Sequence, residues 1–148
     1  MSLKARITED MKAAMRGGEK LRLGTIRMLM AAIKQREVDE RQEMADADIL
    51  QIIGKLIKQR REAATQFAAA DRHELADKET AEAGVLAAYL PAQLDDNEIL
   101  ALIEEALAST GASGAQDMGK LMAALRPRVQ GRADMSRLSQ LVKERLNR

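Results

Sequence analysis

Residues 111–146 read GASGAQDMGKLMAALRPRVQGRADMSRLSQLVKERL, and they show most clearly how this chain is built. Gly111 is expected to end one helix, because glycine readily takes the left-handed conformation of a C-cap. Ser113 and Gln116 have the spacing of a capping box, which predicts that a second helix begins there. Apolar side chains then recur at the helical period, at Met118, Leu121, Met122 and Leu125.

A corner and a further helix follow in the same stretch. Pro127 and Gly131 are expected to end the second helix, and Asp134 is expected to cap the next one. The apolar face of that last helix comprises Met135, Leu138, Leu141, Val142 and Leu146. The stretch therefore predicts two short amphipathic helices joined by a Pro–Gly corner.

The helical period continues upstream. We expect helices over residues 3–16 and 20–41, a third that begins near residue 46 and extends through 67, and a fourth over 71–90. The fourth should have a thin apolar stripe, which comprises Leu75, Ala83, Leu86 and Leu90. It should end before Pro91, because a residue that precedes proline avoids helical geometry.

The expected fold is all-α, since no strand-like alternation is convincing anywhere. Asp95 and Glu98 form a capping box that opens one more helix after Pro91. We therefore predict an N-terminal helical hairpin-type domain of long helices, residues 1–92, followed by a small three-helix domain, residues 93–148. A unit this small is marginally stable by itself.

Composition excludes several kinds of site. The chain has no cysteine, so disulfides, thiolate metal ligands and cysteine nucleophiles are ruled out. His73 is the only histidine; it could pair with Asp77 one turn on, but an exposed histidine near a helix start is the simpler interpretation. No phosphate-binding loop or dinucleotide motif is present. We expect no catalytic residues, no metal and no cofactor.

No apolar run approaches the roughly 20 residues that span a bilayer, and no signal-peptide pattern opens the chain. We therefore expect a cytoplasmic protein without membrane partners. The aromatic content is only 1%. Phe67 and Tyr89 are expected in the core, which argues against recognition of single strands by base stacking.

Charge is segregated along the chain, although the formal net charge is only +1. Residues 1–36 carry nine basic against three acidic side chains, residues 93–111 carry five acidic and no basic ones, and residues 112–148 carry eight basic against three acidic ones. Such blocks bear on binding partners more than on fold.

Two sets of basic residues are candidates for nucleic-acid binding. The tail set surrounds the Pro–Gly corner, where arginine side chains and helix N-termini suit phosphate groups; it comprises Lys120, Arg126, Arg128, Arg132 and Arg137. The second set recurs every seven residues on one helix face, with small residues between its members; it comprises Lys20, Arg27 and Lys34. The alternative for each set is a solvated surface with ordinary ion pairs.

A further basic cluster, Lys55 to Arg61, lies on the third expected helix. Its Arg60 falls within the apolar stripe of that helix. We therefore expect an internal carboxylate partner for Arg60, or a side chain that extends its head group to solvent.

The segment GKLMAALRPRVQGRAD and the amphipathic helix after it resemble the tail of the YqeY proteins. The resemblance continues through LRLGTIRMLMAAIKQREVDER and AAYLPAQLDDNEI, so it covers nearly the whole chain. More loosely, the tail is similar to the last domain of GatB, the B subunit of the glutamine-dependent aminoacyl-tRNA amidotransferase. That likeness implies contact with the tRNA elbow through residues that match the motif, namely Lys120, Arg128, Gly131, Arg132 and Ala133.

Three functions remain open. The first is a non-catalytic module that binds tRNA or other structured RNA, beside amidotransferase or aminoacyl-tRNA synthetase machinery in translation or tRNA-dependent amidation. The second is an accessory component of a glutamine-dependent carbon–nitrogen ligase, active only in complex, because the chain lacks the enzyme's catalytic parts. The third is a protein-interaction adaptor that uses the acidic helix of residues 93–111 and the methionine-rich faces.

Overall fold

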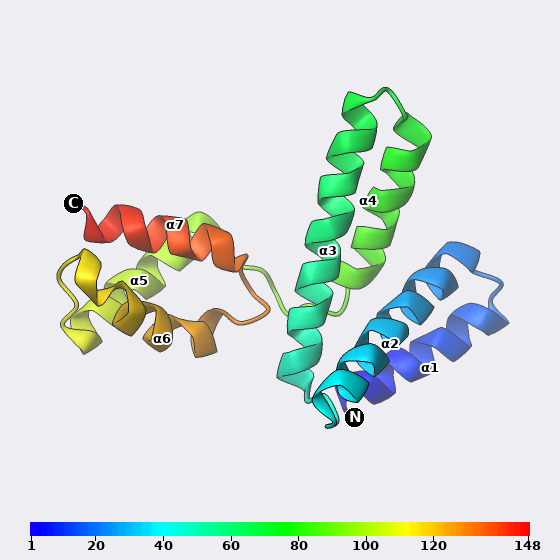
Figure 1. Ribbon diagram of the computed structural model, residues 1–148, viewed down its shortest axis with the longest axis horizontal. Coiled ribbons are helices and arrows are strands. Elements are labelled where there is room, and N and C mark those ends of the chain that lie inside the picture. Colours follow the sequence, from blue (N-terminus) through cyan, green and yellow to red (C-terminus); the bar gives the residue numbers. More distant parts are fainter. The chain divides into compact units, whose positions relative to one another are not determined.

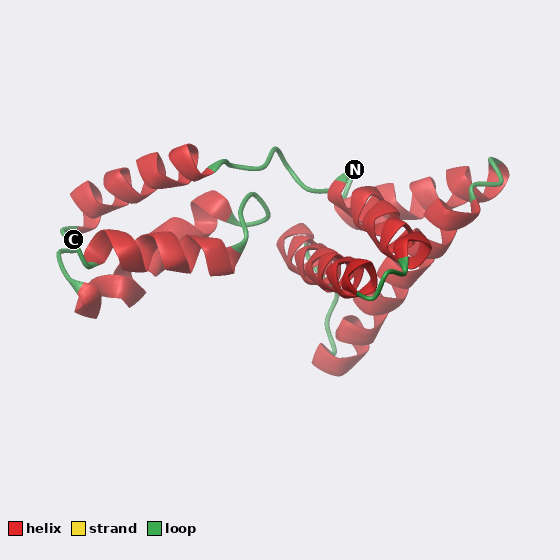
Figure 2. Cartoon of the chain, turned by 90° about the horizontal axis from the view of Figure 1, so that it is seen from above, coloured by secondary structure: helices red, strands yellow, loops and turns green.

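The structure, a computed structural model, describes residues 1–148 and contains helices and loops only (Figures 1 and 2). The all-α prediction is therefore confirmed. The helices are α1 (Leu3–Arg16), α2 (Lys20–Glu40), α3 (Asp46–Ala69), α4 (His73–Ala87), α5 (Asp96–Thr110), α6 (Met118–Val129) and α7 (Met135–Leu146), with a 3-10 turn at Ala115–Asp117 before α6.

The chain divides into two compact units, which we call unit 1 (Met1–Leu90) and unit 2 (Pro91–Arg148). The boundary expected from the sequence lies between residues 92 and 93. Each unit has its own hydrophobic core, and the two cores share no residue.

Unit 1 consists of two helical hairpins, α1–α2 and α3–α4, and α4 lies beside the C-terminal part of the longer α3 (Figure 1). Its core is built from the apolar stripes of all four helices; the fully buried large side chains are Ile7, Ile26, Leu29, Ile49, Ile53 and Leu86. Tyr89 is buried with them, whereas Phe67 is only half-buried and lies outside the core.

Helix α4 is shorter than the expected range of 71–90. It cannot begin at Asp71, because that residue has a φ of 61°, in the left-handed region. At its other end the backbone N–H groups of Tyr89 and Leu90 donate to carbonyls three residues back, which tightens the chain into a turn before Pro91. Leu75 was expected in the apolar stripe but is 39% exposed, and Ala76 takes the buried position instead.

Unit 2 begins as expected. The Asp95 side chain accepts a 2.8 Å hydrogen bond from the Glu98 backbone N–H, and the Glu98 side chain accepts one from the Asp95 N–H, so the capping box is confirmed. Gly111 ends α5 with a φ of 71°, as predicted. Asp134 caps α7 by accepting from the N–H of Ser136.

The start and end of α6 differ from the prediction. Ser113 is not the cap; its backbone N–H donates to the Asp117 carboxylate at 3.0 Å, and the 3-10 turn that follows leads into the helix. Pro127 does not end α6 but lies within its last turn, where the missing N–H leaves only the Ala123 carbonyl without its helical donor. The helix continues to Val129, which is buried, so packing holds the last turn in place.

Candidate nucleic-acid interface

The tail residues that the sequence grouped around the corner do not share one surface. The side chains of Lys120 and Arg126 are exposed and make no ion pair or hydrogen bond. Arg126 and Arg128 are two residues apart on α6, and at 3.6 residues per turn they point about 200° apart around the helix axis. The contacts of Arg128 agree with this, because its guanidinium lies 2.7 Å from the Glu105 carboxylate of α5.

Two arginines of α7 pair with α5 in the same way. The Nε of Arg137 donates to the Asp96 carboxylate at 3.2 Å, and the Nη2 of Arg145 donates to the Glu104 carboxylate at 3.3 Å. Each pair joins residues 41 positions apart, so α5 and α7 run parallel and in fixed register. These hydrogen bonds hold the pKa values of Asp96 and Glu104 below their ordinary range.

The charges of unit 2 therefore compensate one another. Residues 91–148 contain eight basic and eight acidic side chains, and three of the arginines are bound to α5. The acidic and basic blocks are separate in the sequence, and this pairing was not predicted from them. A signal was present, because Asp96 and Glu104 are eight residues apart and so are Arg137 and Arg145.

Arg132 and Gly131 hold the segment that connects the two units. Arg132 Nε donates to the Ala92 carbonyl at 3.3 Å, and the Arg132 carbonyl accepts from the Leu94 N–H at 2.8 Å. The side-chain amide of Gln93 donates to the Gly131 carbonyl at 2.7 Å. Gly131 itself has a φ of 75°, which glycine adopts without strain. Both motif residues thus have a structural role, because they hold residues 92–94 against the rest of unit 2.

The second candidate set does form one surface. Lys20, Arg27 and Lys34 are exposed on a single face of α2, and none of them makes an ion pair. Gly24 and Ala31 lie between them and are exposed as well. We call these five residues the α2 basic row.

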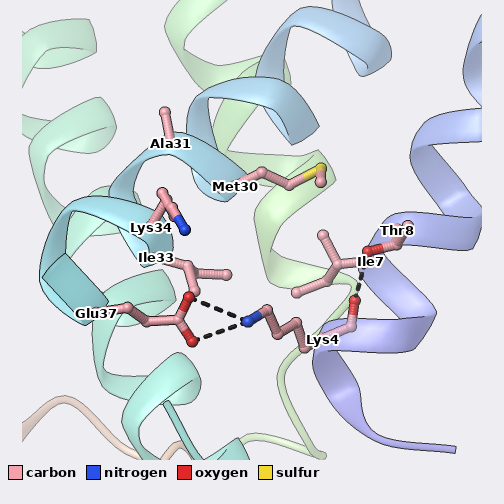
Figure 3. Close-up of a pocket in the computed structure, with 8 residues that line it drawn as sticks. All are labelled: Lys4, Ile7, Thr8, Met30, Ala31, Ile33, Lys34 and Glu37. Atoms are coloured by element: carbon pink, nitrogen blue, oxygen red, sulfur yellow. Dashed lines mark hydrogen bonds and ion pairs between the residues drawn. The ribbon is translucent and has the colours of Figure 1, made fainter. Parts of the chain in front are cut away.

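A groove between α1 and α2 adjoins this row (Figure 3). Ile7, Met30 and Ile33 give it an apolar lining, and Ala31 and Lys34 belong both to the groove and to the α2 basic row. At its end, the Lys4 ammonium donates to both carboxylate oxygens of Glu37, at 2.8 and 3.0 Å.

The Glu37 carboxylate also accepts a 2.9 Å hydrogen bond from the backbone N–H of Met44. The hydrogen bond from Lys4, together with that from Met44, holds the pKa of Glu37 below its ordinary value. The Glu37 carboxylate therefore links α1, α2 and the α2–α3 corner through these hydrogen bonds.

Two outcomes were expected for Arg60, an internal carboxylate partner or a head group extended to solvent, and the structure shows carboxylate partners. Its Nε lies 3.2 Å from the Glu82 carboxylate and 3.8 Å from that of Glu79, both on α4, and its guanidinium also touches the sulfur of Met28. This arginine stabilises the α3–α4 hairpin and is not available to a ligand.

His73 is exposed, and its Nε2 lies 2.6 Å from the carboxylate of Asp71 rather than near Asp77. No group of three or more His, Asp or Glu side chains is arranged to hold a metal ion. No helix combines the length and the apolar character needed to cross a bilayer.

Curated relatives of the chain are named altered inheritance of mitochondria protein 41, mitochondrial. The protein from Eremothecium gossypii is 37% identical over 89 residues, which are 60% of this chain and 49% of the relative. That from Kluyveromyces lactis is 34% identical and covers 57% of this chain and 46% of the relative. The chain thus spans about half the length of these relatives. The protein from Pyrenophora tritici-repentis is 30% identical over 143 residues, 94% of this chain and 78% of the relative.

These names contradict the expectation of a cytoplasmic protein, because the relatives are described as mitochondrial. The physical reason for the error is simple. Composition distinguishes a water-exposed protein from a membrane-spanning one, but it does not distinguish one aqueous compartment from another.

A family model also matches this chain. It is described as Yqey-like protein, and the match covers residues 4–146. It includes all seven helices except the first residue of α1, so both units lie within it. The chain therefore belongs to the YqeY-like family.

Proposed function

We propose that this protein is a non-catalytic module that binds structured RNA, with tRNA as the expected class, in association with translation or tRNA-dependent amidation. The observation that carries the proposal is the α2 basic row, three exposed cations on one helix face with no carboxylate partner. The likeness of the tail to the last domain of GatB supports the choice of tRNA.

The geometry of the row suits a phosphate backbone. Residues seven apart on a helix rise by about 10.5 Å, so Lys20 and Lys34 are separated by roughly 21 Å along α2. Gly24 and Ala31 add almost no side-chain bulk between them, which lets a ligand approach the helix closely. Contacts of this kind give affinity and position, whereas sequence is read at the base edges.

Recognition by shape is favoured over recognition of single-stranded bases. The only aromatic side chains are Tyr89, which is buried, and Phe67, which is half-buried, so no aromatic platform is exposed for stacking. A folded RNA presents its phosphates in a fixed arrangement, and a rigid row of cations can match it.

The proposal is tested by the affinity of the purified full chain for bulk tRNA across a salt series. The test variant carries Lys20→Gln, Arg27→Gln and Lys34→Gln. The matched control carries Lys55→Gln, Lys58→Gln and Arg61→Gln, which removes three exposed cations from α3 of the same unit. The test variant should bind more weakly, and its slope of log K against log salt should fall by roughly 0.7–0.9 for each lost phosphate contact.

Equal losses of tRNA affinity in the test and control variants would show that binding depends on general charge attraction and not on the α2 basic row. Unchanged binding in the test variant would show that the α2 basic row does not contact the RNA. The adaptor function would then lead, because Leu21 and Val38 of α2 are also exposed and suit a protein partner. Turnover that appears only after amidotransferase subunits are added would support the accessory function.

A further inference from the structure

We propose that the acidic side chains of α5 act as an internal competitor. They bind the tail arginines and so compete with an external polyanion for those guanidinium groups. The residues concerned are Asp96, Glu104 and Glu105, bound to Arg137, Arg145 and Arg128 respectively. The inference rests on the proposed function only in that it takes a polyanion as the ligand.

The pairs are placed where a ligand can reach them. The side chains of the three arginines are between 32% and 47% exposed, and those of their carboxylate partners are between 51% and 62% exposed. A phosphate could therefore replace a carboxylate at each guanidinium without unfolding the unit. Exposed ion pairs are weak, so a multivalent anion can displace the carboxylates. Breaking the pairs still costs free energy, which lowers the affinity for that anion.

The charge balance of unit 2 points the same way. With eight basic and eight acidic residues, residues 91–148 exert no net long-range attraction on a polyanion. Removing the three carboxylates of α5 would leave the unit at +3 and would leave three arginines without their partners. The same residues thus set both the long-range field and the local availability of the arginines.

The pairs are separable from the packing that holds α5. That helix is anchored by Ile99, Ile103 and Ala106, which are buried in the core of unit 2. Its start is fixed by the capping box of Asp95 and Glu98, which the three substitutions leave in place. The competitor can therefore be removed while the unit stays folded, and helicity and melting temperature verify this.

The experiment compares two variants of the full chain that differ equally in charge. The test variant carries Asp96→Asn, Glu104→Gln and Glu105→Gln. The control carries Glu43→Gln, Glu62→Gln and Asp77→Asn, which are exposed acids of unit 1 that make no ion pair. Each variant is measured for tRNA affinity across a salt series and for the salt concentration that elutes it from immobilised heparin, a polyanion unrelated to RNA.

The test variant should bind tRNA roughly fivefold to tenfold more tightly than the control, as expected for three weak pairs removed together. Its salt slope should steepen by up to about 0.9 for each arginine that gains a phosphate. Adding Arg128→Gln, Arg137→Gln and Arg145→Gln to the test variant should cancel the gain. The gain over the equally charged control separates the local pairs from net charge, and the cancellation shows that the gain requires the three arginines.

Two further outcomes are decisive. If test and control variants agree on both tRNA and heparin, the α5 acids do not compete and the inference is overturned. If no variant binds tRNA but the test variant elutes from heparin at higher salt than the control, the inference stands and the proposed RNA function fails.

Discussion

The hydroxyl of Tyr89 donates a 2.7 Å hydrogen bond to the carboxylate of Asp10, which joins the last turn of unit 1 to α1. The guanidinium of Arg6 lies over the same ring, 5.0 Å from its centroid, and also donates to the Ala88 carbonyl. Burial, and after it the hydrogen bond and the charge of Asp10, raise the pKa of Tyr89 above its ordinary value.

This pKa can be read directly, because Tyr89 is the only tyrosine and the chain has no tryptophan. In an alkaline titration followed by phenolate absorbance, the native protein should ionise at higher pH than the urea-unfolded chain, whose midpoint should lie near about 10. Asp10→Asn should lower the native midpoint, and Glu9→Gln, one residue away, should leave it nearly unchanged.

The raised pKa also sets the sign of the effect on stability. A group whose folded pKa is raised contributes stability that is fully present below the unfolded pKa and is lost as pH rises through the folded pKa. Stability should therefore fall above about pH 10 in wild type, and less so in Tyr89→Phe. Coincident native and unfolded titration curves would contradict the buried, hydrogen-bonded phenol.

Glu37 gives a second pH-dependent prediction, of opposite sign. Its pKa is lowered in the folded state by the hydrogen bonds from Lys4 and Met44. Its contribution to stability is therefore present above the unfolded pKa and is lost as pH falls through the folded pKa.

Glu37→Gln should accordingly be less stable than wild type at pH 7, and the difference should shrink as the pH falls below the ordinary pKa of a glutamate, about 4.3. Urea denaturation at a series of pH values measures the stability difference and its change with pH. Glu43→Gln is the control, because Glu43 is exposed and unpaired. A difference that is the same at neutral and acid pH would show that the Gln variant is destabilised by packing rather than by lost charge.

The extents of most helices could be predicted from sequence, because the apolar period and the local caps are properties of neighbouring residues. Asp95 with Glu98, Gly111 and Asp134 all act at the ends where local chemistry places them. Ser113 failed as a cap because Asp117 competes for its backbone N–H, and nothing in the capping-box spacing reveals that competition.

The candidate site was harder to predict, because it depends on which helices pack together. A carboxylate partner was one of two outcomes expected for Arg60, since a charge within an apolar stripe needs either a partner or access to solvent. The partners of Arg128, Arg137 and Arg145 were not expected, because those arginines lie on exposed faces where solvent is an adequate partner. The parallel packing of α5 and α7 brings Arg137 and Arg145 into register with the acids of α5, and the packing of α6 on α5 brings Arg128 to Glu105.

Two glycines of unit 2, Gly131 in the corner between α6 and α7 and Gly119 in α6, yield a third prediction. Gly131 has a φ of 75°, so an alanine there must adopt the left-handed region at a cost of about 1–2 kcal/mol. Gly119 is helical, and an added Cβ would meet nothing within 4 Å, so Gly119→Ala should stabilise unit 2 by up to about 1 kcal/mol.

The urea concentrations at the midpoint of unfolding should thus shift in opposite directions in the two variants. In Gly131→Ala the amide of Leu94, which donates to the Arg132 carbonyl, should also exchange its hydrogen faster, because the corner that holds it is strained. Equal stability of both variants would show that the corner adapts to a side chain at residue 131.

The two separate cores predict separate responses to cavities. Ile53 in unit 1 and Leu138 in unit 2 are both fully buried, and truncation of either to alanine should cost about 2–5 kcal/mol. A unit of about 60 residues has only a few kcal/mol of stability to lose, so Leu138→Ala should leave unit 2 largely open. Hydrogen exchange measured by mass spectrometry should then show lost protection in α5, α6 and α7, while peptides from α1 to α4 remain protected.

Ile53→Ala should give the reverse pattern, because no core residue of one unit belongs to the other. Loss of protection throughout the chain in both variants would mean that the two units fold as one cooperative body.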